Sequence, residues 1–176
     1  MFAVLWSYPL ALHLPTHIPG EGPGDNVAFL WSFWWMREAV GSGLDPFRTP
    51  LLFAPAGTDL SLNTHLALPA FVGATVLGGL PLIVTFNLTL LATIFLNGFC
   101  SYWLAWRLTR DRVAALIAGL VFAGSPYLAA RLHGHFNLTT AWTLPLFALA
   151  VPGAVRGSLK AAVAAGVILG ATAYID

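Results

Sequence analysis

The chain has 176 residues, of which 8 are Lys or Arg and 7 are Asp or Glu, so its net charge is +1. Charged residues make up 9% of the sequence and hydrophobic residues 58%, and the mean hydropathy is +0.78. A soluble domain carries about 25% charged residues, because these side chains form its water-facing surface. The composition therefore argues against a soluble enzyme, a disordered linker and a nucleic-acid binder. It indicates a protein whose main partner is the lipid bilayer.

The N-terminal third combines an apolar segment with a large loop. Phe2 to Leu12 is apolar and is interpreted as a first helix, and residues 14–64 form the loop. Within the loop, residues 26–40 predict a helix capped by Asp25 or Asn26. Its many Trp and Phe residues are typical of a helix that lies along the headgroup boundary.

The rest of the chain is a series of apolar segments. Leu60 to Trp106 contains no Asp, Glu, Lys or Arg, and as one helix it would be about 70 Å long, over twice the ~30 Å hydrocarbon thickness. We therefore expect a break at Gly78 to Pro81, which leaves a short re-entrant or interfacial segment from His65 to Leu77. The span candidates that follow are Leu82 to Trp106, Val113 to Ala130, Phe136 to Val155 and Ala161 to Ile175.

Basic residues set the orientation. The short loops 107–112 and 156–160 together hold five of the eight Lys and Arg residues, so the positive-inside rule places both in the cytoplasm and the 14–64 loop outside. We predict an all-α fold: one transmembrane domain, residues 1–176, forming a bundle of about five spans in the cytoplasmic membrane of a bacterium. Because the chain stops directly after a helix, we expect it to be the N-terminal part of a longer protein.

Two carboxylates, Glu21 and Asp25, lie among glycines where the first helix should leave the membrane. A carboxylate at this depth is a candidate general base for an alcohol, since desolvation raises its pKa. The alternative is structural: Asp25 caps the following helix and Glu21 is solvated.

A second group of polar residues lies at the outer end of a span. Arg131, His133, His135 and Asn137 occur together on the side where the charge rule disfavours a cation. A guanidinium with imidazoles and an amide nearby suits a phosphate. The alternatives are an arginine that reaches the outer headgroups and a zinc site on the two histidines, for which no third ligand is evident.

Arg48 is a further candidate for phosphate contact. It follows Asp45-Pro46-Phe47 in the outer loop. The alternative is an ion pair with Asp45 or Asp59. Two asparagines within a span, Asn87 and Asn97, are interpreted as interhelical hydrogen-bonding residues rather than as a transport site.

Several short motifs resemble the N-terminal part of polytopic GT-C type glycosyltransferases, the superfamily of protein O-mannosyltransferases and aminoarabinose transferases. The matching segments are Gly24-Asp25-Asn26, the aromatic run from Trp31 to Trp35, Asp45-Pro46-Phe47, Arg107-Leu108-Thr109, Gly119-Leu120-Val121-Phe122 with Ser125-Pro126-Tyr127, Gly134-His135-Phe136-Asn137-Leu138, and Trp142-Thr143-Leu144-Pro145-Leu146. Together they extend over nearly the whole chain.

The resemblance implies an inverting transferase that takes a sugar from a polyprenyl-phosphate donor on the outer face of the membrane. Asp25 matches the acidic residue that serves as the base in that family, and Glu21 is a second candidate. Many members have two adjacent acidic residues here, whereas Asn26 follows Asp25, which leaves open whether a divalent metal is a cofactor. The acceptor stays undefined: a lipid, a glycan or a protein.

Two alternatives from other classes remain: a secondary transporter or flippase, and a non-catalytic membrane scaffold. A transporter often has an internal repeat and intramembrane charge. This sequence has no evident repeat, and its charged residues lie at the ends of the apolar segments.

Overall fold

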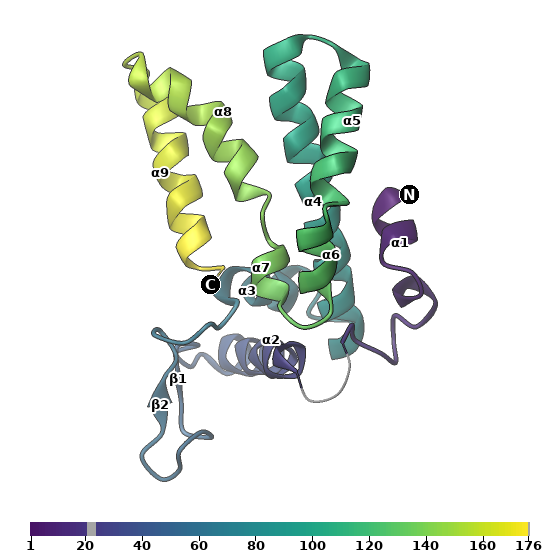
Figure 1. The fold of residues 1–176 in the computed structure, drawn as a ribbon. Helices are drawn as coiled ribbons and strands as arrows, with labels where there is room; N and C mark the ends of the chain where they lie inside the picture. Colours follow the sequence, from purple (N-terminus) through teal and green to yellow (C-terminus); the bar gives the residue numbers. More distant parts are fainter. Residues whose placement is uncertain (21–23, 176) are drawn as a thin grey trace.

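The computed structural model describes residues 1–20 and 24–175, and this part of the chain is almost entirely helical, which confirms an all-α fold (Figure 1). In chain order the elements are α1 (Phe2–Trp6), a 3-10 helix (Leu10–Leu12), α2 (Asp25–Ser42), β1 (Arg48–Thr49), β2 (Thr58–Asp59), α3 (Ala67–Val76), α4 (Leu82–Thr109), α5 (Arg112–Ala123), α6 (Pro126–Leu132), α7 (Phe136–Thr139), α8 (Thr143–Val155) and α9 (Leu159–Ala173).

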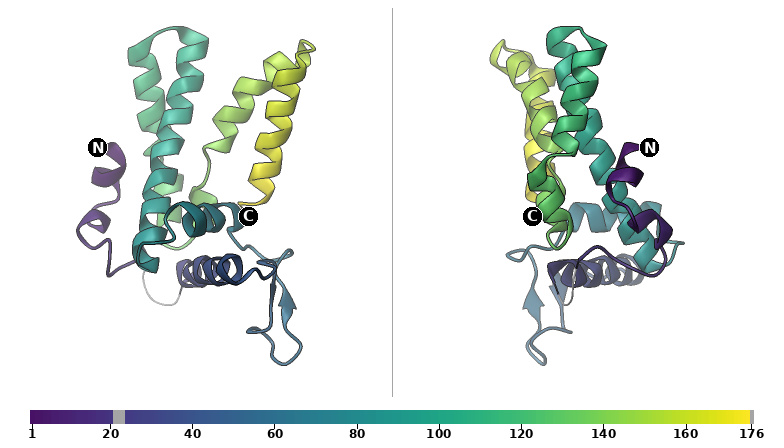
Figure 2. Two further views of the ribbon diagram at one scale, coloured as in Figure 1. Left: turned by 180° about the vertical axis from the view of Figure 1, so that it is seen from behind. Right: turned by 45° about the vertical axis from the view of Figure 1, so that its right-hand side comes forward.

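The helices form two hairpins standing on a crosswise layer. α4 with α5 and α8 with α9 run side by side, whereas α2 and α3 lie across their lower ends (Figures 1 and 2). The antiparallel pair of β1 and β2 projects from this layer. The α4–α5 and α8–α9 turns lie at the opposite end of the molecule (Figure 1).

The N-terminal segment is not the single helix predicted from Phe2 to Leu12. α1 ends at Trp6, and a separate 3-10 helix begins at Leu10. Pro9 lies between them. Proline has no amide hydrogen to donate and disfavours a helical conformation of the residue before it, so the apolar run is divided here.

α2 confirms the helix predicted over residues 26–40, but its N-terminus differs from the prediction. Gly24 is the N-cap, and no side chain caps the helix. Asp25 is instead in the first turn, where its negative charge interacts favourably with the helix dipole. The helix ends at Ser42, and the following Gly43 caps it with a φ of +68°, a left-handed conformation that glycine adopts without strain.

The predicted break at Gly78 to Pro81 is confirmed, since it separates α3 from α4. α3 packs along α2, and the approach is so close at Gly73 that an added Cβ would lie 2.9 Å from the Phe33 ring. Phe33, Phe86 and Phe136 meet beneath it with ring centroids 5.2 to 6.1 Å apart. The core therefore joins α2, α3, α4 and α7.

Two of the predicted spans are divided. Val113 to Ala130 bends by 40° between α5 and α6, because Pro126 starts a new helix that Ser125 caps. Phe136 to Val155 separates into α7 and α8. Among the described residues, α4 alone is long and apolar enough to cross a bilayer as one straight helix, and the bent pair α5–α6 passes the same test only as a unit.

Of the two asparagines of α4, Asn97 makes the interhelical hydrogen bond predicted for it, whereas Asn87 bonds to the N-terminal segment outside any helix. The Asn97 amide donates to the Thr139 carbonyl at 2.7 Å and accepts from the Ala141 amide at 3.1 Å. The Asn87 amide donates to the carbonyls of Leu14 and His17 at 2.8 and 2.7 Å. Both side chains are buried, so they fix the α7–α8 connection and the N-terminal segment to α4.

Candidate functional site

The two polar groups predicted from the sequence come together, and Asn26 holds them there. Its amide nitrogen donates to the carbonyls of Pro19 and Leu132 at 2.8 and 3.3 Å, and its amide oxygen accepts from the Phe136 amide at 3.2 Å. An added Cβ on Gly20 would lie 2.6 Å from the His133 carbonyl. The start of α2 is thus held directly against the α6–α7 connection.

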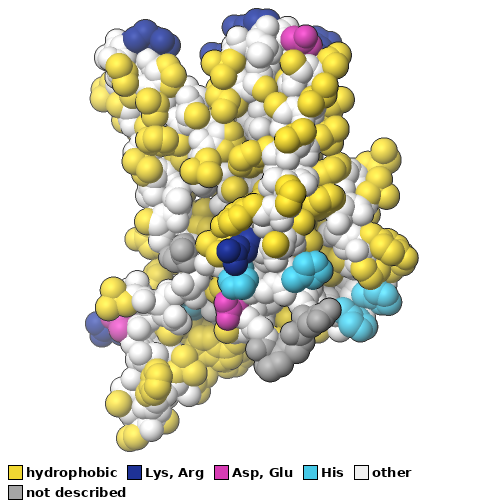
Figure 3. All heavy atoms as spheres, in the orientation of Figure 1, with side chains coloured by type: hydrophobic (Ala, Val, Ile, Leu, Met, Phe, Trp, Pro, Cys, Tyr) yellow, Lys and Arg dark blue, Asp and Glu magenta, His cyan; other side chains and the backbone are white. Residues whose placement is uncertain are grey.

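This arrangement places Asp25 beside His135. The Asp25 Oδ2 and His135 Nε2 atoms are 3.6 Å apart, and the side chains are 63% and 43% exposed. Figure 3 shows basic, histidine and acidic side chains following one another on this face of the molecule. Asp25 is not buried as the sequence led us to expect, because α2 presents its first turn to the surface.

A hollow of about 420 Å³ opens beside this pair. Its wall combines the aromatic face of α2 with polar groups from three parts of the chain. The residues that matter for its chemistry are Asp25, Trp31, Ser32, Asn63, Thr64 and Asn137. Such a mixture of one large apolar surface and a few polar groups is typical of a small-molecule site.

The remaining residues of the predicted phosphate group lie at the edge of this arrangement. Arg131 is in the last turn of α6, and its guanidinium lies 5.3 Å from the centre of the Tyr127 ring. His133 is exposed at the C-terminus of the same helix. Asn137 lines the hollow, whereas Arg131 and His133 do not.

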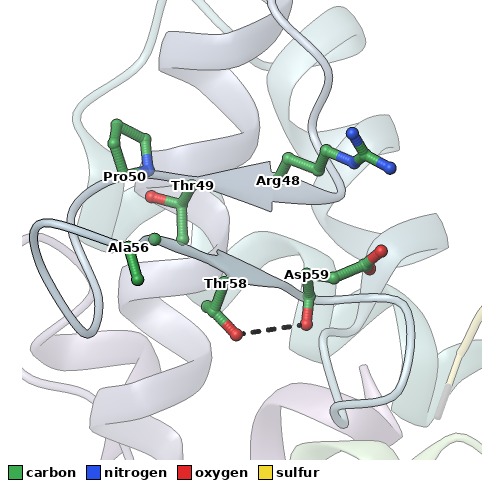
Figure 4. Close-up of a pocket in the computed structure, with 7 residues that line it drawn as sticks. Arg48, Thr49, Pro50, Ala56, Thr58 and Asp59 are labelled. Carbon is green, nitrogen blue, oxygen red and sulfur yellow. Dashed lines mark hydrogen bonds between the residues drawn. The ribbon is translucent and has the colours of Figure 1, made fainter.

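Arg48 lies at a different place. It lines a second hollow, of about 430 Å³, formed by β1, β2 and the ends of the loop that joins them, and Figure 4 shows it with Asp59 at the same end of the strand pair. Its Nε is 3.9 Å from Asp45 Oδ2, so the predicted ion pair is present. Hydrogen bonds from the hydroxyl and amide of Ser61 lower the pKa of Asp59, and Arg48 adds a smaller effect in the same direction.

The structure bears on metal binding only in part. Glu21 lies outside the described residues. Over residues 1–20 and 24–175 there is no cluster of three or more His, Cys, Asp or Glu side chains suited to a metal ion. Asp25 and His135 supply one oxygen and one nitrogen donor close to each other, and they are the residues that would contact a metal bound at this site.

Four of the residues named for the chemistry of the hollow were not predicted as site residues: Trp31, Ser32, Asn63 and Thr64. The sequence marked Trp31 only as part of an interfacial aromatic cluster. Asn63 and Thr64 reach the hollow because the chain returns from the β1–β2 pair toward α3. No local pattern in the sequence signals that return.

The fold and the site define an all-helical protein with one long apolar helix and a polar hollow at the N-terminus of a crosswise helix. Comparison with protein families gives one match, Domain of unknown function (DUF6311), over residues 1–176. The chain belongs to this family. No curated protein and no solved structure matches it.

Proposed function

We propose that this protein is a multi-pass membrane glycosyltransferase. It transfers a sugar, with inversion, from a polyprenyl-phosphate donor to an acceptor on the outer face of the cytoplasmic membrane. The observation that carries the proposal is the Asp25–His135 pair at the edge of a hollow. The resemblance of the Gly24-Asp25-Asn26 segment to GT-C enzymes supports the same assignment.

The distribution of charge supports a membrane orientation with the site outside. The basic residues of the α4–α5 turn and of the α8–α9 turn lie at one end of the molecule, far from the layer of α2 and α3 (Figures 1 and 3). The positive-inside rule assigns that end to the cytoplasm. Asp25 is at the other end of the molecule. In the proposed orientation that end faces the outside of the cell, where the lipid-linked sugar is used.

Asp25 is the proposed general base. Its carboxylate accepts the proton of an acceptor hydroxyl as the acceptor oxygen forms a bond to the anomeric carbon of the sugar. The bond from that carbon to the phosphate oxygen breaks on the opposite face, which inverts the configuration. His135 is positioned to take the proton from Asp25 and release it to water, since both side chains are partly exposed.

The departing polyprenyl phosphate carries the negative charge that develops during transfer. Arg131 is the proposed cation that stabilises it, because it lies in the last turn of α6, four residues before His135, with its guanidinium over the ring of Tyr127. Arg48 is the other residue that the sequence predicted for phosphate contact. Its ion pair with Asp45 and its place on β1, outside the hollow that Asp25 lines, support a structural role instead.

The transport alternative has less support, because the amide nitrogens of Asn87 and Asn97 in α4 are engaged with neighbouring segments; the buried amide oxygen of Asn87 has no hydrogen-bond partner among the described residues. Asn87 and Asn97 donate to backbone carbonyls of neighbouring segments. Both side chains therefore hold neighbouring segments against α4.

The decisive experiment is Asp25→Asn in the full-length protein. Removing the base should lower the rate of polyprenyl-linked sugar consumption by about 100-fold or more. The variant keeps the size of the side chain and the helix start, so it should reach the membrane in normal amounts.

Asp45→Asn is the matched control, because Asp45 is an exposed carboxylate of the same outer loop that lies away from the hollow. It should retain the rate of the unmodified protein. An unchanged rate in Asp25→Asn would show that Asp25 is not the base.

A further inference from the structure

Trp31 is a rigid aromatic surface on the wall of the hollow. Its ring lies parallel to that of Trp35, with an interplanar angle of 6° and centroids 6.3 Å apart. Trp35 is buried, and its Nε1 donates to the Pro46 carbonyl at 3.0 Å. One face of Trp31 is therefore supported by a fixed neighbour, and the residue lines the hollow beside Asp25.

The neighbouring Trp34 differs in a way that makes it a useful reference. It belongs to the same aromatic cluster, at 6.3 Å from both Trp31 and Trp35 and tilted by 49° to each. It is partly buried like Trp31, but it does not line the hollow. A function of the hollow therefore depends on Trp31 and not on Trp34.

The side chains that line the hollow together with Trp31 determine which ligand its ring can bind. Polar side chains surround the hollow: the carboxylate of Asp25, the amides of Asn63 and Asn137, and the hydroxyl of Thr64. A pyranose presents C–H groups on its face and hydroxyls around its edge. The C–H groups match the negative face of an indole, and the hydroxyls match amides and carboxylates.

We propose that Trp31 is the stacking surface of a saccharide subsite in this hollow, so that the hydroxyl activated by Asp25 belongs to a carbohydrate acceptor. The subsite itself depends only on Trp31 and its polar neighbours. The acceptor assignment rests on the proposed function. We assign the hollow to the acceptor rather than to the donor because Arg131, the proposed phosphate-binding residue, does not line it.

The test measures sugar binding without turnover. The full-length protein in nanodiscs, free of glycoside detergents, is mixed with methyl β-glucoside and with methyl α-mannoside, and saturation-transfer NMR detects the bound sugar. We expect transfer to the ring C–H protons of at least one of the two. In Trp31→Leu, which keeps an apolar contact with Trp35, the affinity should fall by about tenfold.

Two variants control for packing. Trp31→Phe keeps an aromatic face and should retain most of the binding, and Trp34→Leu removes an equivalent indole from the same cluster and should bind as the unmodified protein does. No transfer in the unmodified protein, or equal transfer in Trp31→Leu, would overturn the subsite. A hollow occupied by a peptide or a sugar-free headgroup would give that result.

Asp25→Asn separates the two proposals. With a saccharide subsite and a catalytic Asp25, this variant still binds the glycosides through Trp31, Asn63, Thr64 and Asn137, more weakly because one hydroxyl loses the carboxylate, but it does not turn over the donor. If it binds the glycosides and also turns over at the normal rate, the general base is wrong and the acceptor assignment is withdrawn with it. Loss of binding in Trp31→Leu would then still support the subsite.

Discussion

Asn26 is the residue on which the geometry of the site depends most. It is 3% exposed and makes three hydrogen bonds, two as a donor and one as an acceptor, to segments on both sides of α2. Removing this buried amide is costly, because its backbone partners are then left without a hydrogen bond in a place that water does not reach.

We predict that Asn26→Ala lowers the free energy of unfolding by about 1 to 3 kcal/mol. It should also reduce turnover, because His135 lies between Leu132 and Phe136, the two residues of this segment that Asn26 holds. Thermal unfolding followed by circular dichroism measures the first effect. Asn63→Ala, an exposed amide, is the control, and equal melting temperatures for the two variants would contradict the prediction.

His65 gives the fold a dependence on pH. It is 3% exposed and lies edge-on to Phe47, with ring centroids 6.0 Å apart. Burial lowers the pKa of His65 below its ordinary 6.5, and the Pro46 carbonyl opposes this only in part. The folded state thus favours neutral His65, and the unfolded state binds the proton more readily.

The stability contributed by neutral His65 is therefore present above the unfolded pKa and is lost as pH falls from about 6.5 through the folded pKa. We predict that the melting temperature falls between about pH 7 and about pH 5, and that it falls less in His65→Phe. His13→Phe replaces an exposed histidine and should follow the unmodified protein. Identical pH profiles for all three proteins would refute the role of His65.

At the scale of elements, local signals predicted some helices well and missed the bends in others. The outer-loop helix, the break at Gly78 to Pro81 and the long α4 follow from glycine, proline and hydrophobic run length. The bend between α5 and α6 was signalled by Ser125-Pro126, but an uninterrupted apolar run hid it. The division of α7 from α8 was signalled only by Pro145 in the first turn of α8, and Asn97 stabilises it from another helix.

The α4–α5 hairpin depends on a close approach at two glycines. A Cβ added at Gly119 would lie 2.7 Å from the Gly98 carbonyl oxygen and 3.2 Å from the Tyr102 Cβ. Because the nearer atom belongs to the backbone, it cannot move aside as a side chain does. Small residues allow such contacts between apolar helices.

We predict that Gly119→Ala separates α4 from α5 and lowers the free energy of unfolding by about 1 to 3 kcal/mol. Gly166→Ala is the matched control in α9, where an added Cβ has open space. It should be neutral or slightly stabilising, because alanine favours a helix over glycine. Melting curves of both variants in one detergent test this, and a stabilised Gly119→Ala protein would exclude the close contact.

At the scale of the whole molecule, the proposed orientation follows because the hollow and the basic turns lie at opposite ends. The crosswise layer with the hollow lies at one end, and the two turns rich in Lys and Arg lie at the other (Figure 1). A bilayer between them would contact the apolar surfaces of both hairpins, which carry exposed large hydrophobic residues such as Phe95, Leu116 and Val163.

Cysteine labelling tests this orientation. In a Cys100→Ser background, Ser42→Cys should react with an impermeant thiol reagent on intact cells, because Ser42 is exposed at the end of α2. Leu159→Cys, at the first residue of α9 next to the α8–α9 turn and 77% exposed, should react only after the cells are opened. The reverse pattern would place the hollow in the cytoplasm and remove the basis for an outward-facing transferase.

The sequence by itself determined the features that depend on short segments: the all-helical fold, the helix after Asp25, the break before α4 and the two basic turns. These follow from composition, run length and helix-breaking residues, which act within a few positions. The tertiary structure alone decided which polar residues meet. Asp25 and His135 become neighbours through hydrogen bonds between residues 106 and 110 positions apart, whereas Arg48 is paired elsewhere and Trp31 faces the hollow. Such contacts depend on how helices distant in the chain pack against one another, and no local pattern encodes that packing.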